Sequence, residues 1–99
     1  MSIPPTRRIL LTLFTSKSCS LCVNAKDVIK HVQKRIPFDL EQKDIKAPEN
    51  LNWFEKYKYD IPVLHLNDQF ILKHRVEQDE LEKILRKFKE TGIVDQKKN

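Results

Sequence analysis

Residues 8–35 carry the pattern that sets the fold of this chain, and they read RILLTLFTSKSCSLCVNAKDVIKHVQKR. The first part, Arg8–Phe14, is almost continuously apolar and rich in β-forming residues, as in a strand that is covered on both faces. Beyond the polar loop 15–18 the period changes to that of a helix. The expected inward face of this helix consists of Leu21, Ala25, Val28, Ile29 and Val32. The segment therefore predicts a strand, a loop and a helix that extends to Arg35 and is stopped by Pro37.

The chain from Phe38 onward predicts a second strand and a short helix. Phe38, Leu40 and Gln42 alternate with charged residues, which indicates a half-exposed strand. Pro48 opens the helix at a position where its missing N–H costs nothing. The expected buried stripe of this helix is Leu51, Phe54 and Tyr57, with Trp53 alongside.

Two further strands are expected at Ile61–Leu66 and Gln69–Lys73. They are separated by Asn67–Asp68, a pair that tolerates the positive φ of a tight hairpin turn. A final helix is expected over Val76–Glu90, and Gly92 stands where a helix C-cap belongs. The expected inward residues of this helix are Leu81, Ile84, Leu85 and Phe88.

The predicted order of elements is β-α-β-α-β-β-α, an α/β arrangement. The first two strands are joined through a helix, so we expect them to be parallel with a right-handed crossover, whereas the last two form an antiparallel hairpin. The expected fold is a four-stranded mixed sheet with helices on both faces. A chain of 99 residues has room for one core, which we place in residues 8–92. Residues 1–7 and 93–99 are expected to be flexible termini.

The composition excludes several classes of protein. Apolar residues make up 39% and charged residues 33%, which is the balance of a soluble globular chain, and the longest apolar run is far too short to span a bilayer. Gly92 is the single glycine, so a glycine-rich dinucleotide or phosphate loop is excluded. The net charge is +5, but the basic residues are scattered along the sequence. We therefore expect a monomer that binds neither nucleic acid nor membrane.

The two cysteines are Cys19 and Cys22. A small secreted scaffold carries more cysteines, and the N-terminus has no visible signal peptide. We therefore expect a reducing compartment inside the cell, which is the cytoplasm or, as an alternative, the mitochondrion. In such a compartment a C-x-x-C pair is redox-active or metal-binding rather than a structural clamp.

The cysteine pair stands where the first strand gives way to the first helix. The first turn of a helix has unpaired N–H groups and the positive end of the helix dipole, and both stabilise a thiolate. Cys19, at the N-cap, is therefore expected to be the exposed nucleophile, with Lys17 adding positive charge nearby. Cys22, one turn into the helix, is expected to be the resolving thiol. The alternatives are two unreactive thiols or a metal site, but the histidines do not supply further ligands at the usual spacing, so no metal is expected.

Pro62 stands near the start of a strand that reads as buried, where a proline cannot donate to the sheet. A cis peptide bond between Ile61 and Pro62 would account for it, with the backbone N–H and C=O of Ile61 left open to a partner chain. An ordinary trans proline at a strand edge is the alternative.

Three segments of the sequence resemble a known family: LFTSKSCSLCVNAK at residues 13–26, DIPVL at 60–64 and HRVEQDEL at 74–81. Together with the order of elements, they resemble thioredoxin-fold proteins of glutaredoxin size. More closely, they resemble the glutaredoxin-like family that carries C-x-L-C in place of C-P-Y-C. The resemblance implies that Cys19 attacks, that Cys22 resolves, and that the two form a redox-active disulfide. It also implies that Pro62 is a cis-proline facing them.

The chain departs from glutaredoxins where those proteins bind glutathione. Ser16 stands where they usually have a lysine, and Ser20-Leu21 replaces their Pro-Tyr. Their glycine pair after the third strand is replaced by the large side chains of residues 73–77. We therefore expect no tightly bound cofactor, and glutathione only as a weak co-substrate. The expected substrate-binding residues are Lys17, Leu21, Ile61, Pro62 and Arg75.

The leading hypothesis is a small thiol–disulfide oxidoreductase of cell redox homeostasis. It would exchange a Cys19–Cys22 dithiol with a disulfide in a protein substrate or with a mixed disulfide, and an unidentified thiol reductant would regenerate it. One alternative is a binding protein in which Cys19 is a ligand of an iron–sulfur cluster shared between two chains, because such a cluster needs four thiolates or equivalents. The other alternative is a redox-inactive adaptor that uses the fold only as a scaffold.

Overall fold

The computed structural model describes residues 8–96, and its elements follow the order β-α-β-α-β-β-α that the sequence predicts. The strands are β1 (Leu10–Thr15), β2 (Asp39–Asp44), β3 (Val63–Leu66) and β4 (Gln69–Lys73). The helices are α1 (Ser20–Gln33), α2 (Leu51–Tyr57) and α3 (Gln78–Thr91), and a short 3-10 helix, η1 (Pro48–Asn50), leads into α2.

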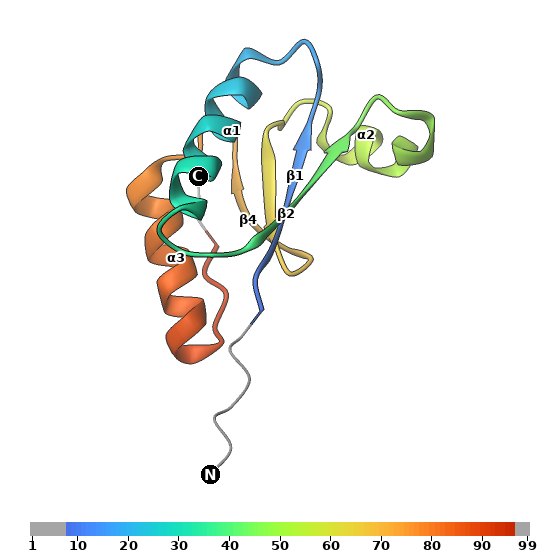
Figure 1. The fold of residues 1–99 in the computed structure, drawn as a ribbon. Helices are drawn as coiled ribbons and strands as arrows, with labels where there is room; N and C mark the ends of the chain where they lie inside the picture. Colours follow the sequence, from blue (N-terminus) through green and yellow to red (C-terminus); the bar gives the residue numbers. More distant parts are fainter. Residues whose placement is uncertain (1–7, 97–99) are drawn as a thin grey trace.

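The four strands form one mixed sheet in the order β2-β1-β3-β4. Strand β1 pairs with β2 in parallel, and it pairs with β3 in the antiparallel sense, as β3 does with β4. Helices α1 and α3 lie together on one face of this sheet, and α2 lies on the other face (Figure 1). The predicted α/β class, the mixed sheet and the placement of helices on both faces are therefore confirmed.

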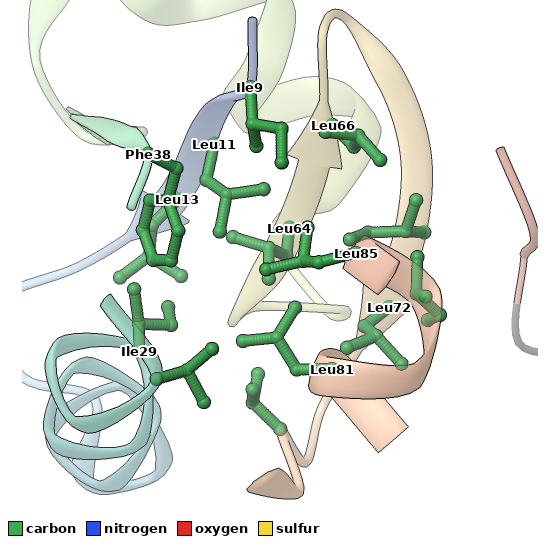
Figure 2. Packing of buried hydrophobic residues seen from close by; sticks show 14 of the residues in the cluster. Ile9, Leu11, Leu13, Ile29, Phe38, Leu64, Leu66, Leu72, Leu81 and Leu85 are labelled. Carbon is green, nitrogen blue, oxygen red and sulfur yellow. The ribbon is translucent and has the colours of Figure 1, made fainter. Parts of the chain in front are cut away.

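The core has two parts because successive residues of β1 point to opposite faces of the sheet. Leu11 and Leu13 point toward α1 and α3, where Ile29 and Leu81 meet them in the larger cluster (Figure 2). Phe14 points the other way, toward α2. The smaller cluster there consists of Phe14, Ile45, Tyr57 and Val63, with Trp53, Phe54, Ile61 and Phe70 packed against it.

The hairpin turn between β3 and β4 has the conformation that its sequence predicts. Asn67 and Asp68 have φ values of 47° and 70°, which both residue types tolerate. The Asn67 amide also fixes the start of β1: its oxygen accepts a hydrogen bond from the Leu10 N–H at 2.8 Å, and its nitrogen donates to the Arg8 carbonyl at 2.8 Å. One turn residue thereby holds together two segments that are far apart in the sequence.

Two apolar side chains are not buried as expected. Leu21 is 40% exposed and Leu51 is 61% exposed, so neither belongs to an inward stripe. Each lies in the first turn of its helix, and contact with the apolar clusters begins further along, at Ala25 in α1 and at Trp53 in α2.

The last helix begins and ends close to its predicted positions. It starts at Gln78 instead of Val76, because Val76 is buried in the larger cluster and Glu77 is extended. Gly92 is the C-cap, with φ 76°, and its N–H donates to the Phe88 carbonyl at 2.8 Å.

Ordered contacts continue past Gly92. Val94 packs against the larger cluster, and Asp95 forms an ion pair with Lys87 at 3.0 Å. Of the termini that were expected to be flexible, residues 1–7 and 97–99 lie outside the described residues. Of the helices within residues 8–96, none has the length and apolar character needed to cross a membrane.

Candidate active site

Cys19 lies at the N-terminus of helix α1. It is the N-cap residue, with extended backbone angles, and its Sγ accepts a hydrogen bond from the Cys22 N–H at 3.2 Å. Its own N–H donates to the Ser16 carbonyl at 3.2 Å, which closes the loop between β1 and α1 into a tight turn. The side chain is half-buried. The sulfur therefore lies where the free N–H groups of the first helical turn favour negative charge.

Cys22 lies one turn further on and is 1% exposed. Burial, together with the hydrogen bond and charge of Cys19, raises the pKa of the Cys22 thiol, while the Thr15 hydroxyl and the main chain of Ser16 act in the opposite direction. Both cysteines are free thiols. The pair thus consists of an accessible outer sulfur and a covered inner sulfur, as the sequence predicts.

Two lysines lie near Cys19, one on the loop that precedes it and one in contact with that loop. Lys17 belongs to the loop and is exposed. Lys46 comes from the segment after β2, and its Nζ lies 3.4 Å from the Ser18 Oγ. Lys46 could not be predicted as part of the site, because it is distant in sequence and no local motif marks it. Parallel pairing of Thr15 with Asp44 brings it to this end of the sheet.

Pro62 lies at the same end of the sheet as the cysteines. Val63 pairs with Phe14, so the residue before Val63 lies where β1 gives way to the cysteine loop. The peptide bond between Ile61 and Pro62 is cis, which confirms the prediction. The expectation that the Ile61 N–H is open is wrong: it donates to the Tyr57 carbonyl at 3.2 Å, because the turn over residues 58–60 brings Ile61 back to the end of α2.

A cleft of about 270 Å³ opens beside the cysteines, between the first two turns of α1 and the segment that joins β4 to α3. It brings together Leu21 and Arg75, both expected to bind substrate. Asn24 and His74 also line it, and neither was predicted to bind substrate. His74 has φ 66°, a left-handed conformation that favours glycine, and its N–H donates to the Pro62 carbonyl at 2.8 Å. The complete lining is Leu21, Asn24, Ala25, His74, Arg75, Val76 and Glu77.

The described part of the chain does not assemble a metal site by itself. Within residues 8–96, no group of three or more His, Cys, Asp or Glu side chains is placed to hold a metal ion. A zinc ion or an iron–sulfur cluster bound through Cys19 would therefore need ligands from outside these residues.

The sheet order, the flanking helices and the dithiol at the start of α1 define a protein of thioredoxin fold, and solved structures agree. The solution structure of protein Ne2328 from Nitrosomonas europaea has a TM-score of 0.66 and 22% sequence identity, covering 78% of this chain and 91% of that one. Thioredoxin-2 of the malaria parasite, described as a component of the parasite's protein secretion machinery, has a TM-score of 0.64 and 21% identity. It covers 81% of this chain and 82% of its own.

Similarity in sequence shows which family the chain belongs to. Residues 10–86 match the family described as Glutaredoxin-like domain (DUF836). A curated glutaredoxin-like protein from Dictyostelium discoideum is 37% identical over an alignment of 79 residues that covers 76% of this chain and 73% of the relative. The chain belongs to the glutaredoxin-like domain family, which supports a redox-related role.

Proposed function

We propose that this protein is a thiol–disulfide oxidoreductase in which Cys19 is the nucleophile and Cys22 the resolving thiol. The observation that carries the proposal is the arrangement of the two sulfur atoms. Cys19 Sγ accepts a hydrogen bond from the Cys22 N–H at 3.2 Å at a helix N-terminus, whereas the Cys22 side chain is buried. A metal ligand set, by contrast, is incomplete within residues 8–96.

The proposed reaction has two displacement steps. The Cys19 thiolate attacks one sulfur of the substrate disulfide, so a Cys19–substrate disulfide forms and the other substrate sulfur leaves as a thiolate, which takes a proton. Cys22 then loses its proton and attacks Cys19 Sγ. The Cys19–Cys22 disulfide forms, and the second substrate thiolate leaves. The substrate gains two electrons, and the protein returns to the dithiol when a thiol reductant supplies two electrons.

The cleft beside the cysteines would hold the part of the substrate next to its disulfide. Leu21, two residues after Cys19 and 40% exposed, offers apolar contact, and Arg75 and Glu77 offer one charge of each sign. This lining suits a polypeptide segment of mixed character better than a single small anion. We propose protein disulfides or mixed disulfides as substrates, and the cytoplasm or the mitochondrion as the compartment, since both are reducing.

The test is to trap the intermediate. Cys22→Ser should accumulate a mixed disulfide between Cys19 and a disulfide-containing protein such as insulin, because nothing resolves it, whereas Cys19→Ser should trap nothing. Mass spectrometry of the non-reduced adduct identifies the cysteine. If neither variant forms an adduct and the wild type does not reduce insulin, the protein is a redox-inactive adaptor. If the anaerobically purified protein is coloured and dimeric, the shared iron–sulfur cluster replaces this proposal.

Glutathione is proposed to be a poor ligand. His74 and Arg75 place large side chains in the cleft beside the cysteines, and Glu77 adds a negative charge there. Calorimetric titration of Cys22→Ser with glutathione should give a dissociation constant of about 1 mM or weaker, or no heat. A micromolar constant would contradict this expectation and would make glutathione a specific co-substrate.

A further inference from the structure

Thr15 has a buried hydroxyl group without a hydrogen-bond partner among residues 8–96. It is the last residue of β1 and is 6% exposed. Its main-chain carbonyl accepts a hydrogen bond from the Ile45 N–H at 3.0 Å, so its backbone is joined to the neighbouring segment. The side-chain Oγ1, however, has no hydrogen-bond partner among residues 8–96. A buried hydroxyl without a partner is unfavourable, so its presence at this position calls for a reason.

The hydroxyl lies on the side of the sheet that faces the cysteines. Side chains of a strand alternate between faces, and Thr15 shares its face with Leu11 and Leu13, which pack toward α1. Cys22 is the buried sulfur of the first turn of α1. The sequence connects the two directly, since only the tight turn closed by the Cys19 N–H separates β1 from the helix.

The groups that act on the Cys22 thiol are few. Burial raises the pKa of Cys22, and so does Cys19 at the N-cap of the same helix, while the Thr15 hydroxyl and the main chain of Ser16 lower it. The hydroxyl therefore favours the thiolate over the thiol. A neutral thiol is a poor acceptor, which is consistent with an unused hydroxyl when Cys22 is protonated.

We propose that Thr15 is a positioning residue for the resolving step, in which its hydroxyl donates a hydrogen bond to Cys22 Sγ when that sulfur carries negative charge. The inference rests on the proposed thiol–disulfide exchange. In the forward direction, Cys22 loses its proton to solvent and attacks Cys19 Sγ, and the substrate thiolate leaves and takes up a proton. In the reverse direction, an external thiolate attacks Cys19, and Cys22 leaves as the thiolate. The same hydrogen bond stabilises Cys22 in both directions.

The experiment uses Ellman's reagent, a small aromatic disulfide whose thiolate product is coloured. Attack by Cys19 releases one coloured anion, and resolution by Cys22 releases the second, so the two phases report the two steps separately. The variant Thr15→Val keeps the shape and removes the hydroxyl, and Thr15→Ser keeps the hydroxyl. Thr12→Val is the matched control, because Thr12 is also buried in β1 but lies on the opposite face.

Thr15→Val should slow the second phase by about tenfold, the rate equivalent of one hydrogen bond, and leave the first phase unchanged. Thr15→Ser should restore the second phase, and Thr12→Val should leave both phases unchanged. Equal second phases in Thr15→Val and the wild type would overturn the inference, and so would a Thr15→Ser variant as slow as Thr15→Val. If the wild type releases no coloured anion, the proposed function itself fails.

A second measurement covers the case in which Thr15→Val folds poorly. In a Cys19→Ser background Cys22 is the only thiol, and its ionisation can be followed by the ultraviolet absorbance of the thiolate against pH. Replacing Thr15 with Ala should move that ionisation to higher pH, and replacing it with Ser should not. A purely structural role for Thr15 would change the stability of these variants but not the pH at which Cys22 ionises.

Discussion

Cys19 and Cys22 are three positions apart, yet helix α1 gives their sulfur atoms different surroundings. Cys19 ends the loop and accepts the Cys22 N–H, so its sulfur lies at the positive end of the helix dipole. Cys22 points into the molecule and is 1% exposed. The difference in burial, rather than any difference in residue type, is what supports the proposed assignment of the two thiols to separate chemical steps.

The two thiols should therefore react at very different rates with iodoacetamide. Cys22→Ser, which leaves Cys19, should be alkylated at neutral pH at least about tenfold faster than Cys19→Ser, which leaves Cys22, because burial and a raised pKa both suppress the Cys22 thiolate. Rates measured by mass spectrometry from pH 6 to 10 give the comparison (about the range over which thiols ionise). Equal rates in the two variants would mean that Cys22 is not covered in solution.

At the scale of single residues, sequence could predict only what is local. Cys19, Cys22 and Pro62, to which we assign proposed roles, stand in short motifs, and the helix start and the strand start that place them are also local signals. Lys46 and His74 reach the site through strand pairing and a loop, so no spacing in the sequence marks them. The bond from the Ile61 N–H to the Tyr57 carbonyl was missed for a related reason, since it depends on where α2 ends.

At the scale of elements, α2 is fixed to the sheet through an aromatic cluster with a polar contact at its centre. The Tyr57 hydroxyl and the His65 Nε2 are 2.7 Å apart and both are buried. Phe14 and Trp53 surround the pair, with ring centroids 4.7 Å and 5.7 Å from His65. A helix of seven residues is too short to be stable by itself, so this packing holds it in place.

Tyr57→Phe should lower the free energy of unfolding by about 1–3 kcal/mol, because it leaves a buried imidazole nitrogen without its partner. Tyr59→Phe makes the same chemical change at a side chain that is 83% exposed, two residues further on, and should have almost no effect. Urea unfolding of the two variants and the wild type measures both values. A loss of similar size in both variants would show that the hydrogen bond to His65 does not stabilise α2.

The two helices on the other face are joined through Glu82 of α3. Its carboxylate lies 3.2 Å from Arg35, which follows α1, and 3.1 Å from Arg86 one turn along α3. The Gln78 amide also donates to it at 3.0 Å. These contacts, the hydrogen bond of Gln78 first among them, lower the pKa of Glu82 below its usual value, although burial acts against them.

Glu82→Gln should destabilise the fold at neutral pH more than Glu90→Gln, which makes the same change at an exposed site of the same helix. The folded-state pKa of Glu82 is lowered, so its contribution is present above the ordinary glutamate value of 4.5 and is lost as the pH falls through the folded value. The deficit of Glu82→Gln should therefore shrink in acid. Thermal unfolding of both variants at pH 7 and at about pH 3 makes the comparison. A deficit that does not change with pH would show that packing, and not charge, is responsible.

At the scale of the whole molecule, the architecture could be predicted because hydrophobic period, turn residues and helix ends agree with one another along the chain. The Asn67–Asp68 turn, Gly92 and the largely apolar β1 and β3 each favour one local structure. Exposure was harder to predict than element type. The spacing of Leu51 fits a buried helical stripe, yet its side chain is exposed because of how α2 packs on the sheet. The position of α2 depends on residues of three other elements.

His65 gives the whole fold a dependence on pH, because it is buried in β3 and its pKa is lowered by burial first and by the charge of Lys56 second, while Asp68 acts in the opposite direction. An unfolded chain takes up this proton near the ordinary histidine value of 6.5, and the folded chain only at lower pH. Between the two values the unfolded state binds more protons, so the free energy of unfolding should fall as the pH falls below about 6.5, by at most about 1.4 kcal/mol per pH unit for one group.

His65→Gln should remove this dependence, because glutamine can still form a hydrogen bond with Tyr57 but does not titrate. The variant will be less stable at pH 7, where neutral histidine packs well, but its free energy of unfolding should stay nearly level between about pH 7 and 5, where that of the wild type declines. Glu82 does not contribute to this pH dependence, since its contribution to stability is lost only below the ordinary glutamate pKa of 4.5. Urea unfolding at half-unit steps of pH gives both curves. Parallel curves would mean that His65 is protonated as readily in the folded chain as in the unfolded one, and that the aromatic cluster around it admits water.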